Sequence, residues 1–193
     1  MKKGVFSLAM ALVFGAGNAT EPVADEKKEV NTDASTVTWK AYKVTGSHTG
    51  NLQLKQGSLM FNGEKLTGGE FTVDMSTLVS TDLADDPGNK GKLEGHLNSE
   101  DFFSTEKHAT SKLVFTKVKS TGKNSYEVTG DLTIKDITKP VVFDVSVYGS
   151  KATATVKVDR TNYDIKYGSG NFFENLGDKT IYDEFDLVVD LEF

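Results

Sequence analysis

The sequence predicts an all-β protein in which about eight antiparallel strands close into an up-and-down barrel, with a short helix inserted between the middle strands. Apolar and polar residues alternate along most of the chain, which is typical of strands that face water on one side. Glycines and polar turn residues separate these runs at short intervals. One long interval, residues 76–111, lacks the alternation. A chain of 193 residues with 37% hydrophobic content is sufficient for one core.

The clearest pair of strands is the hairpin predicted over residues 125–148. Its first strand has one apolar face, formed by Tyr126, Val128, Leu132 and Ile134. Its second strand has an apolar face formed by Val141, Phe143, Val145 and Val147. Residues 136–139 supply a polar turn, and Pro140, which lacks an N–H, is expected at the first residue of the second strand.

The other strands follow from the same alternation. The first strand begins at Thr36, and its apolar phase consists of Val37, Trp39 and Ala41. Tyr42 and Val44 then shift that phase, which indicates a bulge or a strand covered on both faces. Three further strands are predicted around Leu52 and Leu54, around Leu59 and Phe61, and from Phe71 through Val73 to Met75. Later strands are predicted over residues 113–118, 152–158 and 181–193.

The interval of residues 76–111 is too long for an unstructured connection in a compact domain, so a helix is expected there. Leu93 and Leu97 are one helical turn apart. A serine followed by two acidic residues is expected to cap a second short turn that presents Phe102 and Phe103 to the barrel. The interval is therefore interpreted as a lid or plug.

Strands with one apolar face bury that face in one of two ways, as two packed sheets or as one closed sheet. The local connections favour the closed barrel. An eight-stranded barrel has an interior that side chains fill or that holds one small ligand. Small residues (Gly130, Ala152 and Ala154) stand beside large aromatic residues on the inward faces. An apolar lumen with spare volume is one interpretation, and a packed core is the other.

Composition and spacing exclude several classes of function. The formal charge is −6 and no basic cluster occurs, which argues against a nucleic-acid partner because such binding needs lysines and arginines on phosphates. The absence of cysteine excludes disulfides, thiolate nucleophiles and cysteine metal sites. The three histidines lack metal-binding spacing, and no Ser-His-Asp pattern or phosphate loop occurs. We therefore predict no metal-ligating and no catalytic residue.

The beginning of the chain is predicted to be a targeting signal and not part of the folded domain. Two lysines precede an apolar run in residues 1–19, and small residues at positions 17 and 19 suit cleavage after Ala19 of a secretory signal peptide. A membrane anchor needs about 20 apolar residues, which is more than this run provides. Residues 20–34 are charged and aperiodic, so a disordered leader is expected before a barrel domain over residues 35–193.

Four segments together carry a resemblance to a known family. They are GKLEGHLNSEDFFSTEKHAT, VTGDLTIKDITKPVVFDV, VKVDRTNYDIKYG and DLVVDLEF, in this order. The chain from residue 36 resembles the YceI-like family of secreted, lipocalin-like proteins, although it has Lys135 and Asp136 where many members have His-Gly. The resemblance implies a barrel elongated by an inserted helix, whose lumen holds a polyprenyl lipid or a quinone tail. It also implies a periplasmic location and no established catalytic residues.

Twelve residues are expected to contact the isoprenoid chain: Trp39, His48, Phe71, Val73, Phe115, Leu132, Phe143, Val145, Arg160, Phe172, Phe185 and Leu187. Arg160 either clasps a diphosphate head group or forms a structural ion pair, because its planar fork suits both. His48 is either a ligand contact or an exposed turn histidine. Phe172 and Phe173 form an entrance, touch a membrane or a donor protein, or pack on the barrel rim.

The predicted function of this periplasmic or secreted protein is binding of an isoprenoid lipid or isoprenoid quinone for carriage or storage, with no further cofactor required. The expected partners are that lipid and a transient membrane contact, and a homodimer is an open alternative. Two other classes stay open. One is a solid-core stress-response or interaction protein. The other is an isomerase or hydrolase in which a carboxylate such as Asp183 faces His48 inside the barrel.

Overall fold

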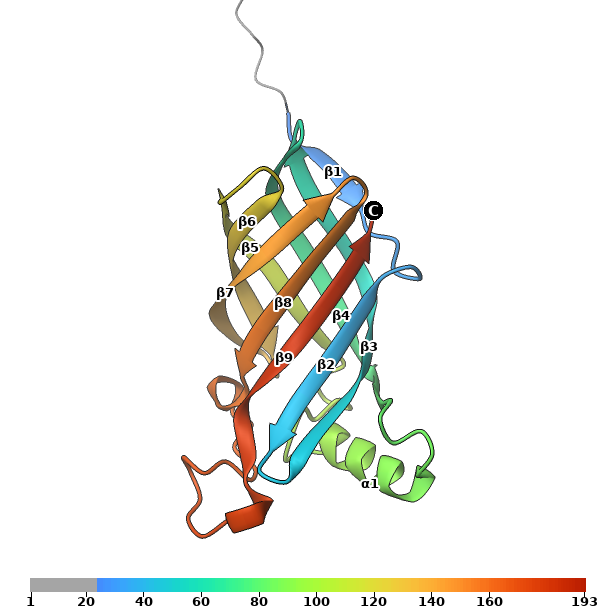
Figure 1. The fold of residues 1–193 in the computed structure, drawn as a ribbon, viewed down its shortest axis with the longest axis vertical. Helices are drawn as coiled ribbons and strands as arrows, with labels where there is room; N and C mark the ends of the chain where they lie inside the picture. Colours follow the sequence, from blue (N-terminus) through green and yellow to red (C-terminus); the bar gives the residue numbers. More distant parts are fainter. Residues whose placement is uncertain (1–23) are drawn as a thin grey trace, which may run out of the picture.

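The structure, a computed structural model, describes residues 24–193. In this part of the chain nine antiparallel strands form one sheet in the order β1-β3-β2-β9-β8-β7-β6-β5-β4, which closes because β3 also pairs with β4 (Figure 1). The strands are β1 (Glu26–Glu29), β2 (Thr36–Lys43), β3 (Gly46–Asn62), β4 (Lys65–Ser80), β5 (Thr110–Ser120), β6 (Ser125–Ile134), β7 (Ile137–Tyr148), β8 (Lys151–Asp159) and β9 (Ile181–Glu192). Strands β2 to β9 make a closed eight-stranded ring, so the predicted up-and-down barrel is confirmed.

The hairpin β6–β7 has the predicted faces but a different turn. The turn consists of Lys135 and Asp136, which both have positive φ (51° and 60°), the geometry of a type I′ turn whose twist matches that of the strands. The prediction that residues 136–139 form the turn and that Pro140 begins the strand is therefore wrong. Pro140 lies inside β7 opposite Asp131, where β8 no longer pairs with β7, so its missing N–H removes no ladder bond on that side.

Strand β3 combines what the sequence predicts as two strands. Leu54 and Leu59 lie on one continuous strand, which pairs with β2 along its first part and with β1 along its last part. Three register shifts interrupt its pairing with β4. A bulge adds a residue to one strand and breaks the two-residue period without ending the strand, which is why the sequence pattern suggests one strand around Leu54 and another around Leu59.

The predicted disordered leader over residues 20–34 is wrong for its second half. Strand β1 (Glu26–Glu29) pairs with Ser58 to Phe61 of β3, and Val30 is buried and donates its N–H to the carbonyl of Gly57 at 2.8 Å. The ordering comes from backbone hydrogen bonds to a strand edge, which composition does not report. The predicted signal peptide lies outside the described residues.

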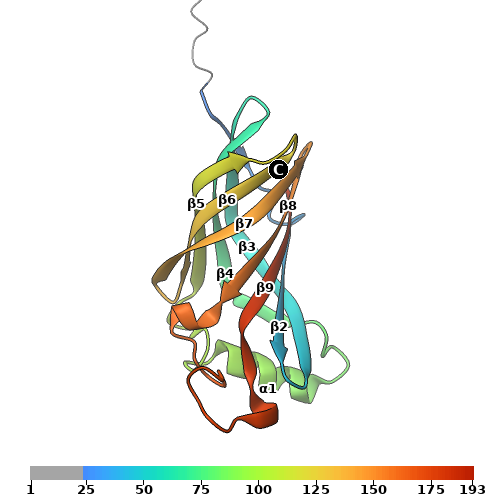
Figure 2. The same cartoon turned by 60° about the vertical axis from the view of Figure 1, so that its left-hand side comes forward.

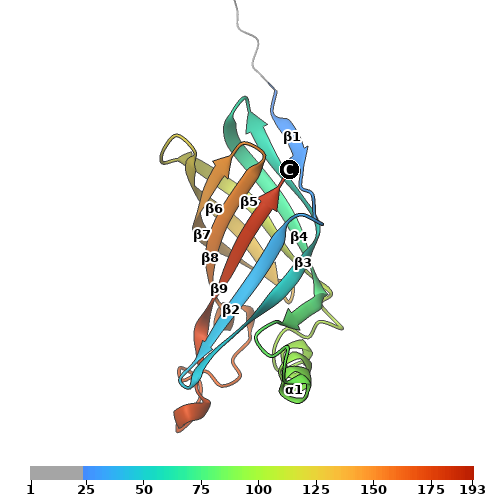
Figure 3. The same ribbon diagram turned by 45° about the vertical axis from the view of Figure 1, so that its right-hand side comes forward.

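Helix α1 (Pro87–Asn98) confirms the predicted helical insertion between β4 and β5. Asp86 caps its start by accepting a hydrogen bond from the N–H of Asn89 at 3.1 Å, and Pro87 occupies a position that tolerates the missing N–H. Two short 3-10 helices, η1 (Arg160–Tyr163) and η2 (Gly177–Lys179), lie between β8 and β9. Figures 2 and 3 show α1 and the loop before β9 at the same end of the barrel, opposite β1.

The barrel interior differs between its two ends. Toward the end opposite α1 the core contains the buried side chains of Phe61, Leu66, Tyr126, Val128 and Val147. Here the hydroxyl of Tyr126 accepts a hydrogen bond from the N–H of Leu66 at 3.3 Å and donates one to the carbonyl of Glu64 at 3.4 Å. None of these side chains borders the internal cavity, although its lining extends toward this end as far as Leu59, Ala152 and Leu191.

Candidate ligand-binding lumen

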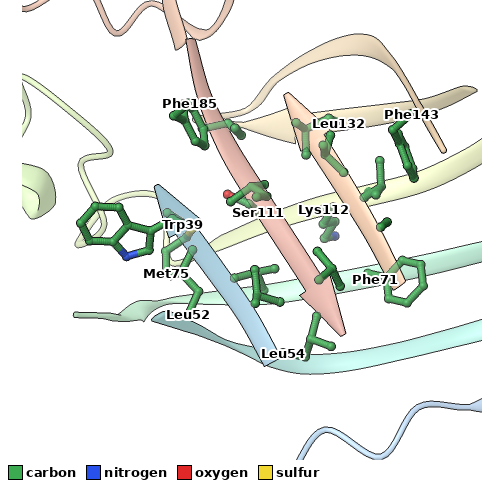
Figure 4. Close-up of a pocket in the computed structure, with 18 of the residues that line it drawn as sticks. Trp39, Leu52, Leu54, Phe71, Met75, Ser111, Lys112, Leu132, Phe143 and Phe185 are labelled. Atoms are coloured by element: carbon green, nitrogen blue, oxygen red, sulfur yellow. The ribbon is translucent and has the colours of Figure 1, made fainter. Parts of the chain in front are cut away.

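The barrel encloses an apolar cavity of about 150 Å³, whose lining runs from Phe102 and Phe103 at the α1 end to Ala152 and Leu191 toward the other end. Ten of the twelve residues predicted to contact a ligand line it: Trp39, Phe71, Val73, Phe115, Leu132, Phe143, Val145, Arg160, Phe185 and Leu187. Figure 4 shows Trp39 and Phe185 toward one end of this cavity and Phe71 and Phe143 toward the other. The structure therefore brings together side chains from six strands and from the 3-10 helix η1, which the sequence places far apart.

Aromatic rings bound the inner end of the cavity. The ring of Phe115 lies 5.6 Å from that of Phe71 and 5.7 Å from that of Phe143, measured between centroids. The three rings come from β4, β5 and β7 and form a continuous aromatic surface. Tilted and edge-to-face contacts at these distances are favourable beyond the area they bury. This surface forms part of the cavity wall.

The outer end is covered by the segment that follows α1. Phe103 packs edge-on against Phe185 at 6.3 Å, and Phe102 contacts His96 at 4.9 Å and Tyr167 at 5.9 Å. Phe102 is buried and also borders the cavity. The expectation that Phe102 and Phe103 face the barrel is confirmed, and we call α1 together with residues 99–109 the lid.

Trp39 is held in place by its indole N–H. This group donates to the carbonyl of Val79 at 3.1 Å, so the polar atom of the ring is satisfied by the end of β4. The apolar part of the ring lies over Gly50, its partner on β3. Trp39 therefore presents only hydrocarbon to the cavity.

Of the two roles that the sequence leaves open for Arg160, the structure has the structural ion pair. Its guanidinium donates to the carbonyls of Tyr182 (3.1 Å), Ile165 (2.8 Å) and Ile181 (3.0 Å), and to Oδ1 of Asp183 (3.3 Å). Burial lowers the pKa of Arg160 while Asp183 opposes that change, and a guanidinium stays charged in either case. With these donors engaged, Arg160 fixes the start of β9 beside the cavity.

His48 does not line the cavity. Its Nδ1 lies 2.8 Å from Oδ2 of Asp82, and Oδ1 of the same carboxylate accepts hydrogen bonds from the hydroxyl of Ser80 at 2.8 Å and the N–H of Thr49 at 3.2 Å. Burial acts to raise the pKa of Asp82, but these hydrogen bonds outweigh it and the pKa lies below its ordinary value. The cluster links the start of β3 to the segment after β4.

The alternative of an enzyme depends on Asp183 facing His48 inside the barrel, and these two side chains do not meet. Asp183 contacts Arg160 and accepts from Nδ2 of Asn171 at 2.7 Å, while His48 contacts Asp82. Within residues 24–193 no group of three or more His, Asp or Glu side chains is arranged to hold a metal ion.

Phe172 also lies outside the cavity. It and Phe173 are each half-exposed in the loop between η1 and η2, and the ammonium of Lys166 lies 5.2 Å from the ring of Phe172. Neither ring packs down on the barrel rim as a buried residue. Tyr167, in the same loop, is exposed to a similar degree.

The twelve residues predicted to contact the ligand do not include several residues that line the cavity. They include Val37, Leu52, Leu54, Met75, Leu78, Leu97, Phe102, Phe103, Ile134, Ala154, Val189 and Leu191. Most lie in the inward phase of a strand that the alternation already indicates, so the phase was the signal that could have found them. Leu78 lies on β4 outside the phase of Phe71, Val73 and Met75, and Leu97 lies on α1, so the two-residue period does not predict either one.

A closed antiparallel barrel with an apolar cavity beneath a helical lid defines a lipocalin-like protein. The chain belongs to the YceI-like family, since the YceI-like domain model matches residues 29–193. A UPF0312 protein of Pseudomonas putida is 30% identical over 151 residues, which cover 77% of this chain and 74% of that protein. A UPF0312 protein of Photorhabdus laumondii is 34% identical over 118 residues, 59% of each chain.

Solved structures share the fold. BcnA of Burkholderia cenocepacia aligns with a TM-score of 0.60 and 19% identity over 84% of this chain and 98% of that one. A polyisoprenoid binding domain from Saccharophagus degradans aligns with a TM-score of 0.55 and 12% identity, over 85% of this chain and 97% of that one. In the described part of this chain, no helix is long and apolar enough to span a membrane.

Proposed function

We propose that this protein binds an isoprenoid chain, the tail of a polyprenyl lipid or quinone, in the barrel cavity. The observation that carries the proposal is the lining itself, which is almost entirely aliphatic and aromatic and is closed at its inner end by the Phe71, Phe115 and Phe143 rings. Removing a hydrocarbon from water contributes about 0.8 kcal/mol for each buried CH₂. The solved relative described as a polyisoprenoid binding domain supports this choice of ligand.

The size of the cavity indicates how a chain enters. A volume of about 150 Å³ is roughly that which takes one benzene-sized molecule. A chain of several isoprene units therefore requires side chains to move. The lid is the weakest boundary, because Leu97 is the one buried side chain of α1 and the helix contains Gly88, Gly91 and Gly95, each about 1 kcal/mol less favourable than alanine in a helix. The tail enters at this end, and the head group stays near solvent beside it.

We further propose that the loop with Phe172 and Phe173 touches a membrane during loading. Two adjacent half-exposed rings beside the lid suit the interfacial region of a bilayer, and Lys166 lies next to one of them. Carriage or storage of the lipid in the periplasm fits this arrangement. The homodimer stays a prediction, and no catalytic step is proposed.

The proposal is tested by native mass spectrometry of protein purified gently from its own secretory compartment, followed by organic extraction. We expect a stoichiometric extra mass that extracts as a prenyl lipid or an isoprenoid quinone. Ala154→Phe, which fills the cavity, is expected to abolish the extra mass, while Thr155→Phe on the exposed face of the same strand is expected to keep it. A bare mass, with no uptake of added polyprenyl lipid, would contradict the proposal.

A further inference from the structure

Aromatic rings of the cavity wall lie directly over glycines of neighbouring strands. A Cβ atom added at Gly57 would lie 2.7 Å from Cδ1 of Phe71, and one added at Gly69 would lie 3.0 Å from Cε2 of Phe115. Carbon atoms in contact are normally about 3.5 to 4.0 Å apart. Each ring thus occupies the space that a side chain on the neighbouring strand would fill.

Backbone conformation does not explain these glycines. The glycines with positive φ among the described residues are Gly46, Gly63, Gly149, Gly168 and Gly177. Gly57 and Gly69 lie inside strands β3 and β4 and have ordinary backbone angles. Glycine within a strand costs stability and contributes no side chain to the core. The reason for glycine at these two positions is therefore steric. The missing side chains leave room for the rings of Phe71 and Phe115 to lie against the barrel wall.

A side chain at either glycine would push a ring toward the cavity. The space at Gly57 is also bounded by Val30 at 3.5 Å, and that at Gly69 by Leu59 at 3.1 Å. Phe71 and Phe115 already contact each other, so neither ring has free space along the wall. The open volume next to both rings is the cavity that they line.

We propose that Gly57 and Gly69 determine ligand specificity by seating the rings of Phe71 and Phe115, which makes the lumen wide enough for a methyl-branched chain. This inference rests on the proposed function. An isoprenoid chain carries a methyl branch on every unit and is broader than a straight acyl chain. A lumen whose rings are recessed over glycines accommodates the branches, and a lumen whose rings project inward admits only the straight chain.

The test compares farnesol with dodecanol, whose main chains have the same length although only farnesol is branched. Binding to the purified protein is followed by the fluorescence of Trp39, which is the single tryptophan and lines the cavity. We expect the wild-type protein to prefer farnesol. Gly57→Ala is expected to weaken farnesol binding at least about tenfold and to change dodecanol binding by less than about threefold. Gly69→Ala is expected to act in the same direction.

Gly68→Ala is the matched control, because a Cβ there meets Met60 at 3.5 Å, an ordinary contact, and no ring is displaced. It is expected to leave both affinities unchanged. The double variant Gly57→Ala/Phe71→Leu removes the displaced ring and is expected to restore the preference for farnesol. This variant decides the matter if Gly57→Ala alone does not fold.

Four outcomes would overturn the inference. If Gly57→Ala folds and binds farnesol as the wild type does, the position of the Phe71 ring over Gly57 does not determine specificity. A Gly57→Ala/Phe71→Leu variant without the preference would lead to the same conclusion. Equal binding of farnesol and dodecanol by the wild type would overturn this inference alone, whereas binding of neither alcohol would overturn the proposed function with it.

Discussion

The guanidinium of Arg160 donates a hydrogen bond to Oδ1 of Asp183 at 3.3 Å in a site that is almost closed to solvent. The pair joins η1 to the first part of β9, and Phe102 of the lid lies 5.7 Å from the guanidinium carbon. The same arginine also satisfies three backbone carbonyls. It therefore fixes the rim of the cavity on which the lid rests.

We expect Arg160→Ala to lower the free energy of unfolding by about 3 to 5 kcal/mol, because it leaves a partly buried carboxylate and three carbonyls without their donor. Arg160→Lys should recover little, since an ammonium lacks the planar fork that reaches several acceptors at once. Urea unfolding at neutral pH measures both. A stable Arg160→Ala variant would show that the network is not needed for the fold.

Asp82 is expected to make the free energy of unfolding depend on pH in the acid range. Its pKa lies below the ordinary value of 3.8 because hydrogen bonds from His48, Ser80 and Thr49 outweigh burial. A carboxylate with a lowered pKa in the folded state adds stability above the pKa of the unfolded chain, and that stability is lost as pH falls below it. The difference in unfolding free energy between wild type and Asp82→Asn should therefore be constant above about pH 5 and shrink below about pH 4.

Unfolding measured between acid and neutral pH checks this prediction. Asp85→Asn, which changes an exposed carboxylate in the same segment, is the control and should leave the profile near that of the wild type. A difference for Asp82→Asn that stays constant down to strongly acid pH would contradict the assignment.

Two buried tyrosines should respond oppositely to the same change. The hydroxyl of Tyr163 is buried without a hydrogen-bond partner among the described residues, whereas that of Tyr126 donates to Glu64 and accepts from Leu66. Tyr163→Phe should raise the unfolding free energy by about 1 kcal/mol, and Tyr126→Phe should lower it by a similar amount. Urea unfolding of the two variants measures the difference, and a loss of stability in Tyr163→Phe would reveal a partner for its hydroxyl.

Tyr163 also predicts an effect of alkaline pH. Burial raises its pKa to about 12, since the phenolate would lose its solvation. A pKa raised in the folded state gives stability that is present below the pKa of the unfolded chain and is lost above it. Between about pH 10 and pH 12 the wild type should lose stability relative to Tyr163→Phe, as thermal unfolding would detect. If the stability of the wild type and of Tyr163→Phe changed in parallel with pH, the raised pKa of Tyr163 would be contradicted.

The glycines of the lid predict how fast a ligand exchanges. A Cβ atom at Gly91 or Gly95 meets nothing within 4 Å, so Gly91→Ala/Gly95→Ala should stabilise α1 by about 1 kcal/mol for each change. We expect slower release of bound farnesol and slower amide hydrogen exchange in α1. Leu97→Ala, which removes the buried contact of the helix, should speed both processes. Equal release rates in the two variants would place the entrance away from the lid.

Much of the fold could be predicted from the sequence, because a two-residue period assigns each side chain to a face wherever one face is buried. The apolar faces of β6, β7 and β8 are buried as predicted, and the helix lies in the predicted interval. The failures lie where the period is interrupted. Bulges in β3 resemble a strand end, the Lys135–Asp136 turn depends on positive φ, and β1 is ordered by the strand beside it.

For the candidate site, the sequence by itself determined which side chains point into the barrel, and ten of the twelve predicted residues border the cavity as a result. Only the tertiary structure decided which inward residues border open space and which pack solidly. Phe71 and Phe61 share an inward apolar character, yet only Phe71 lines the cavity. The physical reason is that a cavity depends on the volume left between strands paired in one register, and alternation along a single strand carries no information about that volume.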